Sequence, residues 1–226
     1  ERRGAVTSRR LYGNGVSVLS GDLLLVGALD RTRRAAPELL ADLIGTLQRL
    51  VNGEIVQLRG RTELDVSEAT YYRVLEDKTA SLFSFATRSG ARLAGANEEQ
   101  VQALSGYGEA LGIAFQLIDD VIDYSGENTG KALFADLAEG KLTLPLVLAI
   151  EADPELAPLV RRIHEGEREP VAEVSRRVVQ SGACEIVRKR AIEFTERARH
   201  LLQTLPASRA RQLLDVVALE MTQRLA

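Results

Sequence analysis

The sequence has no tryptophan, one cysteine and few aromatic residues, which make up 4% of the chain. With Cys184 as its single cysteine, the chain can form neither an internal disulfide nor a cysteine-rich zinc site. The net charge of −3 at pH 7 lacks the basic character of a nucleic-acid-binding domain. No apolar run reaches the length needed to span a bilayer. We therefore expect a cytoplasmic protein that has neither nucleic acid nor membrane insertion among its interactions.

The chain is rich in residues that favour helices, chiefly Leu, Ala, Val, Arg and Glu. Apolar residues repeat with a helical period, as between Glu38 and Leu58, and no strand-like alternation of useful length occurs. Ser67, Asn97 and Ser208 stand where side chains of their type cap the start of a helix. Tandem repeats and low-complexity linkers are absent from the sequence. These features predict an all-α fold in one domain, residues 1–226.

The most unusual predicted helix covers residues 112–123, where three aspartates and an amide interrupt an apolar run. Asp119 and Asp123 lie one turn apart on one face, Gln116 lies a turn earlier, and Asp120 stands beside them. Carboxylates at this spacing repel one another and are costly to bury unpaired, so a positive partner must face them. A hard divalent cation that carries substrate phosphate oxygens is one such partner. Arg or Lys side chains along a solvated helix edge are the other, and spacing alone leaves both open.

Cationic residues are available to supply this charge. Lys131 follows a turn-rich segment just after the acidic helix, and Lys141 comes later in the same stretch, so two lysines bracket one loop. Arg2 and Arg3 form a doublet whose guanidinium groups could bind phosphate bidentately. Solvated loop charge is the plainer interpretation of the doublet. A loop with two lysines beside carboxylates is the arrangement that a metal–phosphate site requires.

Lys78 and Thr79 fall in the middle of a predicted helix, with apolar residues after them. Lys78 either faces a site or pairs with its sequence neighbours Glu76 and Asp77, and the second reading is the simpler one. The sequence contains no glycine-rich phosphate loop, no dinucleotide-binding fingerprint and no nucleophile elbow. Those absences argue against nucleotide-binding and serine hydrolase chemistry of the familiar types.

Taken in order along the chain, these motifs resemble those of the trans-isoprenyl diphosphate synthases, the polyprenyl synthetase family. Residues 115–123 resemble the second aspartate-rich motif of that family, and residues 136–145 resemble its downstream lysine-containing signature. Residues 78–79 are similar to its lysine-threonine motif, and residues 2–3 to the arginine pair after its first aspartate-rich motif. The sequence departs from the pattern at residues 132–134, where the family normally has a proline and a glycine. The resemblance covers nearly the whole chain.

The resemblance implies a single-domain, all-α helical bundle of the isoprenoid synthase type around a central cavity. It implies a prenyltransferase that condenses isopentenyl diphosphate with an allylic diphosphate to make a trans-polyprenyl diphosphate. The reaction would proceed by Mg²⁺-dependent ionisation, condensation and elimination. The resemblance also implies a homodimer. Residues 17–24 and the Leu82-Phe83 region favour a medium or long product over a farnesyl-type one.

The resemblance also implies a role for each matching residue. The metal ligands that it implies are Asp119, Asp120 and Asp123. The catalytic residues that it implies are Asp119, Asp120, Lys78 and Gln116. The cationic residues that would bind substrate diphosphates are Arg2, Arg3, Lys78, Lys131 and Lys141. Arg2 would contact the allylic diphosphate and Arg3 the isopentenyl diphosphate, while Thr79 and Gln116 would face the allylic cation.

The sequence starts at Glu1, where the resemblance places the end of a first aspartate-rich motif. We therefore expect it to be part of a longer enzyme, with that motif upstream. A non-catalytic subunit of a heteromeric synthase is an alternative, although such subunits tend to lose their acidic motifs. A class I terpene synthase is another, although these usually lack the lysine signature and are richer in aromatic residues. A helical scaffold with chance acidic pairs would need several coincidences.

Overall fold

The computed structural model describes residues 5–64, 66–125 and 134–223. Within these ranges the regular structure is helical and contains no β-strand, which confirms the predicted all-α class. The chain forms two compact units, residues 1–45 and 46–226. The assignment of the whole chain to one domain stays a prediction.

Helix α1 (Ser8–Ala35) is the main element of the first unit. It bends at Gly13, whose φ of +82° lies in the region that glycine adopts without strain. None of its residues is buried, and apolar side chains such as Leu23 and Leu24 are 73% and 75% exposed. The helix has 28 residues, and an 18-residue window within it has a mean hydropathy of 1.2. The expectation that no segment is long and apolar enough to span a membrane was therefore wrong, although one such helix is weak evidence for a span.

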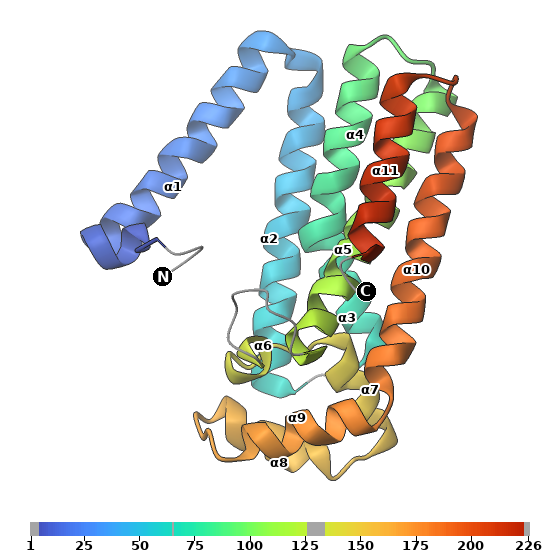
Figure 1. Ribbon diagram of the computed structural model, residues 1–226. Helices are drawn as coiled ribbons and strands as arrows, with labels where there is room; N and C mark the ends of the chain where they lie inside the picture. Colours follow the sequence, from blue (N-terminus) through green and yellow to red (C-terminus); the bar gives the residue numbers. More distant parts are fainter. Residues whose placement is uncertain (1–4, 65, 126–133, 224–226) are drawn as a thin grey trace. The chain divides into compact units, whose positions relative to one another are not determined.

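The second unit is a helical bundle (Figure 1). Helix α2 (Leu40–Glu63) begins in the first unit, after the short 3₁₀ helix η1 (Pro37–Leu39), and continues into the second. The remaining elements with their bounds are α3 (Glu68–Leu75), the π-helical segment η2 (Glu76–Ala80), α4 (Ser81–Leu93), α5 (Glu98–Ser125), α6 (Ala135–Ala138), α7 (Leu144–Ala152), α8 (Leu156–His164), α9 (Pro170–Gln180), α10 (Ala183–Leu201), the 3₁₀ helix η3 (Leu202–Thr204) and α11 (Arg209–Gln223).

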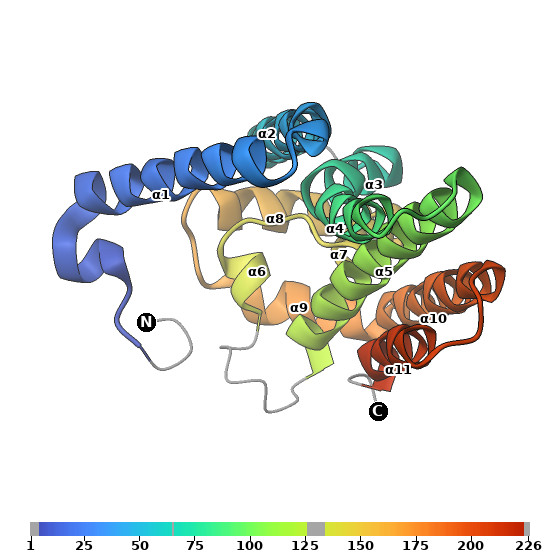
Figure 2. The same ribbon diagram turned by 90° about the horizontal axis from the view of Figure 1, so that it is seen from above.

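Helix α5 forms the centre of the second unit, because it packs against α4, α7, α10 and α11 (Figure 2). Its side chains Leu117, Ile118 and Val121 are at most 1% exposed and lie in an apolar cluster together with residues of α7 and α10. Burial of this apolar area is the main stabilising contribution to the bundle. The aspartates of the predicted acidic helix are therefore carried on the central helix of the unit.

The predicted helix starts agree with the capping groups that the structure contains. The Ser67 hydroxyl accepts from the Thr70 N–H at 3.1 Å, ahead of α3. The side chain of Asn97 accepts from the Gln100 N–H at 2.9 Å, and the side chain of Gln100 accepts from the Asn97 N–H at 3.2 Å. This reciprocal pair is the capping box that the sequence predicted for the start of α5. The Ser208 hydroxyl caps α11 in the same way, through the Arg211 N–H at 3.1 Å.

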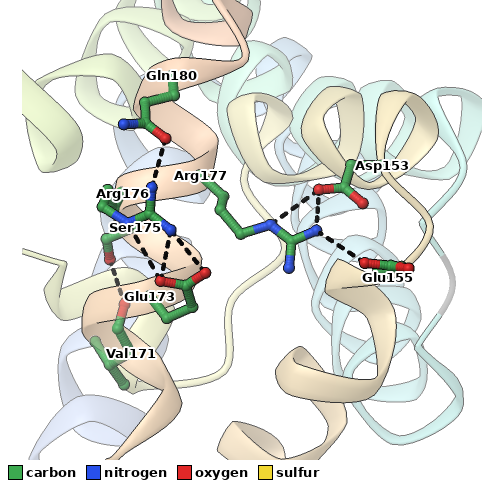
Figure 3. Close-up of polar contacts among 8 residues, drawn as sticks. All are labelled: Asp153, Glu155, Val171, Glu173, Ser175, Arg176, Arg177 and Gln180. Carbon is green, nitrogen blue, oxygen red and sulfur yellow. Dashed lines mark hydrogen bonds and ion pairs between the residues drawn. The ribbon is translucent and has the colours of Figure 1, made fainter.

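Helices α8 and α9 lie across one end of the bundle (Figure 1). On α9, Arg177 reaches the turn between α7 and α8 and forms hydrogen bonds to the Asp153 carboxylate, with its Nη2 also 3.8 Å from Glu155 (Figure 3). Arg176 on the same helix turns the other way and pairs with Glu173 at 2.7 Å (Figure 3). The first contact joins two elements, whereas the second is local to α9.

Candidate active site

A cavity of about 230 Å³ opens where five segments of the second unit meet. Helices α2 and α3, the segment η2, helix α5 and the stretch from α6 to α7 all contribute side chains to its wall. The residues of the predicted site that line it are Lys78, Thr79, Gln116, Asp119, Asp120 and Lys141. The cavity therefore brings together both carboxylate and lysine side chains from motifs that are far apart in the sequence.

The three aspartates of the acidic helix have different surroundings. Asp119 lines the cavity and is half-buried. Asp120 also lines it but is only 4% exposed. Asp123, also 4% exposed, is not among the lining residues, and its Oδ2 accepts a hydrogen bond from the Asp136 backbone N–H at 3.2 Å. Asp119 and Asp120 are thus the two aspartates of this motif in contact with the cavity, and the assignment of all three as metal ligands stays a prediction.

The carboxylate of Asp120 accepts hydrogen bonds from three directions. The Tyr71 hydroxyl donates to Oδ2 at 2.7 Å, and the Leu144 backbone N–H donates to the same atom at 3.1 Å. The Gln116 side-chain amide donates to Oδ1 at 3.2 Å. Burial raises the pKa of the Asp120 carboxyl to about 7, although these hydrogen bonds favour the ionised form. Burial and the Asp120 charge also raise the pKa of the Tyr71 hydroxyl, which keeps it a donor.

Both lysines of the cavity wall are held by acidic or amide groups. Lys78 Nζ lies 2.5 Å from a Glu54 carboxylate oxygen and 2.7 Å from Gln57 Oε1, both on α2. The simpler reading, a pair with Glu76 or Asp77, was wrong, because Asp77 pairs with Arg49 on α2 at 2.8 Å. The Lys78 ammonium is therefore directed toward α2 at the edge of the cavity.

Lys141 is held in a similar way in the stretch between α6 and α7. Its Nζ lies 2.5 Å from Asp136 Oδ1 and 3.0 Å from a Glu139 carboxylate oxygen. Although partial burial opposes ionisation, these two acidic partners raise the pKa of Lys141, so it stays cationic at neutral pH. Asp136 is 7% exposed and lines the cavity as well. The stretch that carries Lys141 thus also supplies its acidic partners, Asp136 and Glu139.

Thr79 and Gln116 meet across the boundary between η2 and α5. The Thr79 hydroxyl donates to Gln116 Oε1 at 3.4 Å, while the amide nitrogen of Gln116 is engaged by Asp120. Thr79 belongs to a π-helical turn, a helix irregularity that is frequent at functional sites. Lys78 and Thr79 both lie within this turn, and both line the cavity.

Some residues of the predicted site lie outside the described ranges, and some residues that line the cavity were given no role from the sequence. Arg2, Arg3 and Lys131 lie outside the described residues. Tyr71 and Asp136 line the cavity without having been assigned a function from the sequence. For Asp136 a signal existed, because it stands in the lysine-containing signature. For Tyr71 no local pattern distinguished it from Tyr72, its neighbour on α3.

The carboxylates at the cavity fit a magnesium ion that is bound jointly by protein and substrate. Among the residues that the structure describes, no group of three or more His, Cys, Asp or Glu side chains is placed to hold a metal by itself. Asp119 and Asp120 supply hard oxygen donors, and Mg²⁺ is usually held by one or two carboxylates together with phosphate oxygens and water. A diphosphate in the cavity would supply the remaining oxygens, and the lysines would share its charge.

Comparison with known proteins gives a consistent result. The family model of polyprenyl synthetases matches residues 1–181. Octaprenyl diphosphate synthase of Haemophilus influenzae is 37% identical over 223 residues, which cover 96% of this chain and 68% of that protein. Octaprenyl diphosphate synthase of Escherichia coli is 38% identical over 232 residues, which cover 99% of this chain and 71% of that protein.

Solved structures agree with this result. A decaprenyl diphosphate synthase from Rhodobacter capsulatus has a TM-score of 0.92 at 36% identity, with 100% of this chain and 72% of that chain covered. A polyprenyl synthase from Caulobacter crescentus, complexed with calcium and isoprenyl diphosphate, has a TM-score of 0.90 at 33% identity, with 100% and 71% covered. The fold, the family model and these relatives lead to one conclusion: the chain belongs to the polyprenyl synthetase family of trans-prenyltransferases.

Proposed function

We propose that this protein condenses isopentenyl diphosphate with an allylic diphosphate and releases a trans-polyprenyl diphosphate longer by five carbons. The observation that carries the proposal is the cavity, where Asp119 and Asp120 face the same space as Lys78 and Lys141. A magnesium ion held by the aspartates would neutralise charge on the departing diphosphate. The relatives described above are prenyl diphosphate synthases, which favours chain elongation over cyclisation by a terpene synthase.

In this proposal the chain's own residues bind the substrates and assist the departure of diphosphate. Lys78, Lys141 and Lys131 bind the allylic diphosphate and share the negative charge that grows on it as the carbon–oxygen bond breaks. Arg2 binds the same diphosphate and Arg3 that of isopentenyl diphosphate. Asp119, Asp120 and Asp123 are the proposed metal ligands. Asp119 and Asp120 line the cavity, and Asp123 also accepts a hydrogen bond from the Asp136 backbone N–H.

The carbon chemistry follows from ionisation of the allylic substrate. Loss of diphosphate leaves an allylic carbocation, which the dipoles of the Thr79 hydroxyl and the Gln116 amide oxygen stabilise. The double bond of isopentenyl diphosphate attacks this carbon, and a new carbon–carbon bond forms. The resulting cation loses a proton to the released diphosphate and regains a double bond. Apolar helix faces around the site exclude water, which would otherwise trap the cation as an alcohol.

Three finer features belong to the same proposal. We propose a medium or long product, because relatives that are 37–40% identical are named octaprenyl, nonaprenyl and hexaprenyl diphosphate synthases. We propose a homodimer, as the family resemblance implies, and a cytoplasmic location. A non-catalytic subunit is a less favoured alternative, because the chain keeps Asp119 and Asp120 together with Lys78 and Lys141 at the cavity.

The test of this function is a condensation assay with a substitution in the cavity. Isopentenyl diphosphate, an allylic primer and Mg²⁺ are incubated with the protein, and the extracted products are sized by chromatography and mass spectrometry. We expect Mg²⁺-dependent products that grow in five-carbon steps. Asp119→Ala should lower the rate by roughly 100-fold or more, the effect of losing a group that stabilises developing charge.

The matched control is Glu109→Ala, which removes an exposed carboxylate from the same helix, away from the cavity. Its rate should equal that of the wild type, and both variants should keep the helical circular dichroism spectrum of the wild type. Near-normal turnover by Asp119→Ala would refute the metal assignment. Absence of any five-carbon elongation by the wild type, with Mg²⁺ and several primers, would refute the proposed reaction.

A further inference from the structure

Tyr71 makes the shortest hydrogen bond to the buried carboxylate of Asp120, which lines the cavity. Its hydroxyl donates to Asp120 Oδ2 at 2.7 Å, and the Leu144 N–H donates to the same oxygen at 3.1 Å. A carboxylate oxygen has two lone pairs in the plane of the group, so these two donors together saturate Oδ2. Among the residues that the structure describes, the other oxygen, Oδ1, accepts a longer bond of 3.2 Å from the Gln116 amide. The two oxygens of Asp120 are therefore not equivalent.

This difference fixes the orientation of the carboxylate. A terminal carboxylate torsion is broad and two-fold, so the Asp120 side chain alone does not define which oxygen faces the cavity. Two donors from separate elements, α3 and the start of α7, hold Oδ2 in place. Oδ1 is then kept on the side of Gln116, which itself lines the cavity. Loss of either donor would free the carboxylate to rotate.

Packing against aromatic and apolar neighbours holds the Tyr71 side chain in place. Its ring packs edge-on against Tyr72, with centroids 5.5 Å apart and an interplanar angle of 83°. Tyr72 in turn packs against Phe194 of α10, with ring centroids 6.4 Å apart. Both tyrosines pack on the apolar cluster around α5. A chain of aromatic contacts therefore fixes the Tyr71 hydroxyl relative to α5.

We propose that Tyr71 is a positioning residue, which orients the Asp120 carboxylate so that Oδ1 is presented to a cation and diphosphate bound in the cavity. This role rests on the proposed function, because it requires that Asp120 contribute to that binding. Tyr71 acts through Asp120 and does not touch the reacting carbons. Groups that orient a metal-binding carboxylate commonly change metal affinity or activity by about 10–100-fold when they are removed.

The experiment measures binding without turnover. Inorganic diphosphate is titrated into the protein by isothermal calorimetry at a series of Mg²⁺ concentrations. Tyr71→Phe keeps the ring and removes only the hydroxyl, and we expect it to weaken Mg²⁺-dependent diphosphate binding by about tenfold or more. The control is Tyr72→Phe, which removes the hydroxyl of the adjacent ring, outside the cavity wall, and should change binding less than about twofold. Thermal unfolding curves check that both variants remain folded.

A double-mutant cycle separates positioning from a general structural effect. If Tyr71 acts through Asp120, then Tyr71→Phe should cause no further loss of binding in an Asp120→Asn background. Additive losses in the double variant, or wild-type binding by Tyr71→Phe, would overturn the proposed role of Tyr71 alone. If the wild type itself bound no diphosphate at any Mg²⁺ concentration, the proposed function would fail together with this role.

Discussion

Tyr107, on α5, is 1% exposed, and its hydroxyl donates to the Leu214 carbonyl of α11 at 2.8 Å. Burial raises its pKa to about 12, and the Asp215 charge contributes in the same direction. Between pH 10 and 12 the folded protein therefore keeps a proton that the unfolded chain has lost. Since the native state binds more protons in this range, stability must fall as the pH rises through it.

We predict that Tyr107→Phe lowers the free energy of unfolding by about 1 kcal/mol at pH 7, because one hydrogen bond is lost. It should also reduce the decline in stability between pH 10 and 12, since the titrating group is gone. Urea unfolding followed by circular dichroism across this pH range measures both effects. Tyr12→Phe is the control, because Tyr12 is 65% exposed and should leave the curve unchanged. An alkaline decline equal to that of the wild type in Tyr107→Phe would contradict the prediction.

At the scale of single residues, the sequence identified the types of side chain at the cavity but not their environments. Helical spacing placed Asp119, Asp120 and Asp123 near one another, and all three are on α5. It could not tell that Asp120 and Asp123 are buried, because burial depends on elements distant in sequence. The partner of Lys78 was missed for the same reason, since Glu54 reaches it from another helix.

At the scale of elements, the contact between α4 and α5 depends on two glycines. A Cβ at Gly108 would lie 2.4 Å from the Thr87 hydroxyl and 2.5 Å from the Phe83 carbonyl oxygen. A Cβ at Gly112 would lie 2.7 Å from the Cα of Ala80. Backbone atoms cannot move aside as a flexible side chain can, so any larger residue would push the helices apart. The position of η2 beside α5 therefore depends on these glycines.

We predict that Gly108→Ala lowers the free energy of unfolding by about 1–3 kcal/mol, the usual cost of overpacking. Gly90→Ala is the matched control, because Gly90 is an exposed position in α4 where an added Cβ would meet no atom within 4 Å. There the same change should stabilise the protein by about 0.4–1 kcal/mol, since alanine restricts the unfolded chain. Denaturant unfolding measures both, and a stabilised Gly108→Ala would refute the close contact.

Helix boundaries were the most predictable property of the elements, because capping groups are local in sequence. Ser67, Asn97 and Ser208 each cap the helix that the sequence assigned to them. The π-helical turn η2 was not predicted, because an irregularity of five residues is too short to be recognised from apolar periodicity. That turn sets the direction of Lys78 and Thr79, so the geometry of the site was less predictable than its composition.

At the scale of the whole molecule, the predicted homodimer can be tested through α1. Val16, Leu19, Leu23 and Val26 follow helical spacing along one face and are 52–73% exposed. An exposed apolar stripe of this kind is typical of a surface that another protein covers. We predict a particle of about twice 24.7 kDa in multi-angle light scattering. Leu23→Glu should shift it toward the monomer, because a charge would be buried without a partner.

Asn14→Glu is the control for the dimer, because it adds the same charge half a turn away around α1, off the apolar stripe. It should leave the particle mass unchanged. A monomeric wild type at micromolar concentration would contradict the dimer, and a dimeric Leu23→Glu would place the interface elsewhere.

Two hydrogen bonds of the acidic helix have a consequence for how mutants of this protein are interpreted. Asp120 accepts from the Leu144 N–H and Asp123 from the Asp136 N–H, so two carboxylates fasten α5 to both ends of the stretch that carries Lys141. Removal of either aspartate would remove one of these attachments and could displace Lys141. Loss of activity in an Asp120 or Asp123 variant would therefore have two explanations, displacement of the stretch that carries Lys141 and loss of a metal ligand. Asp119, a half-buried carboxylate that lines the cavity, is the position where a substitution tests a proposed metal ligand directly.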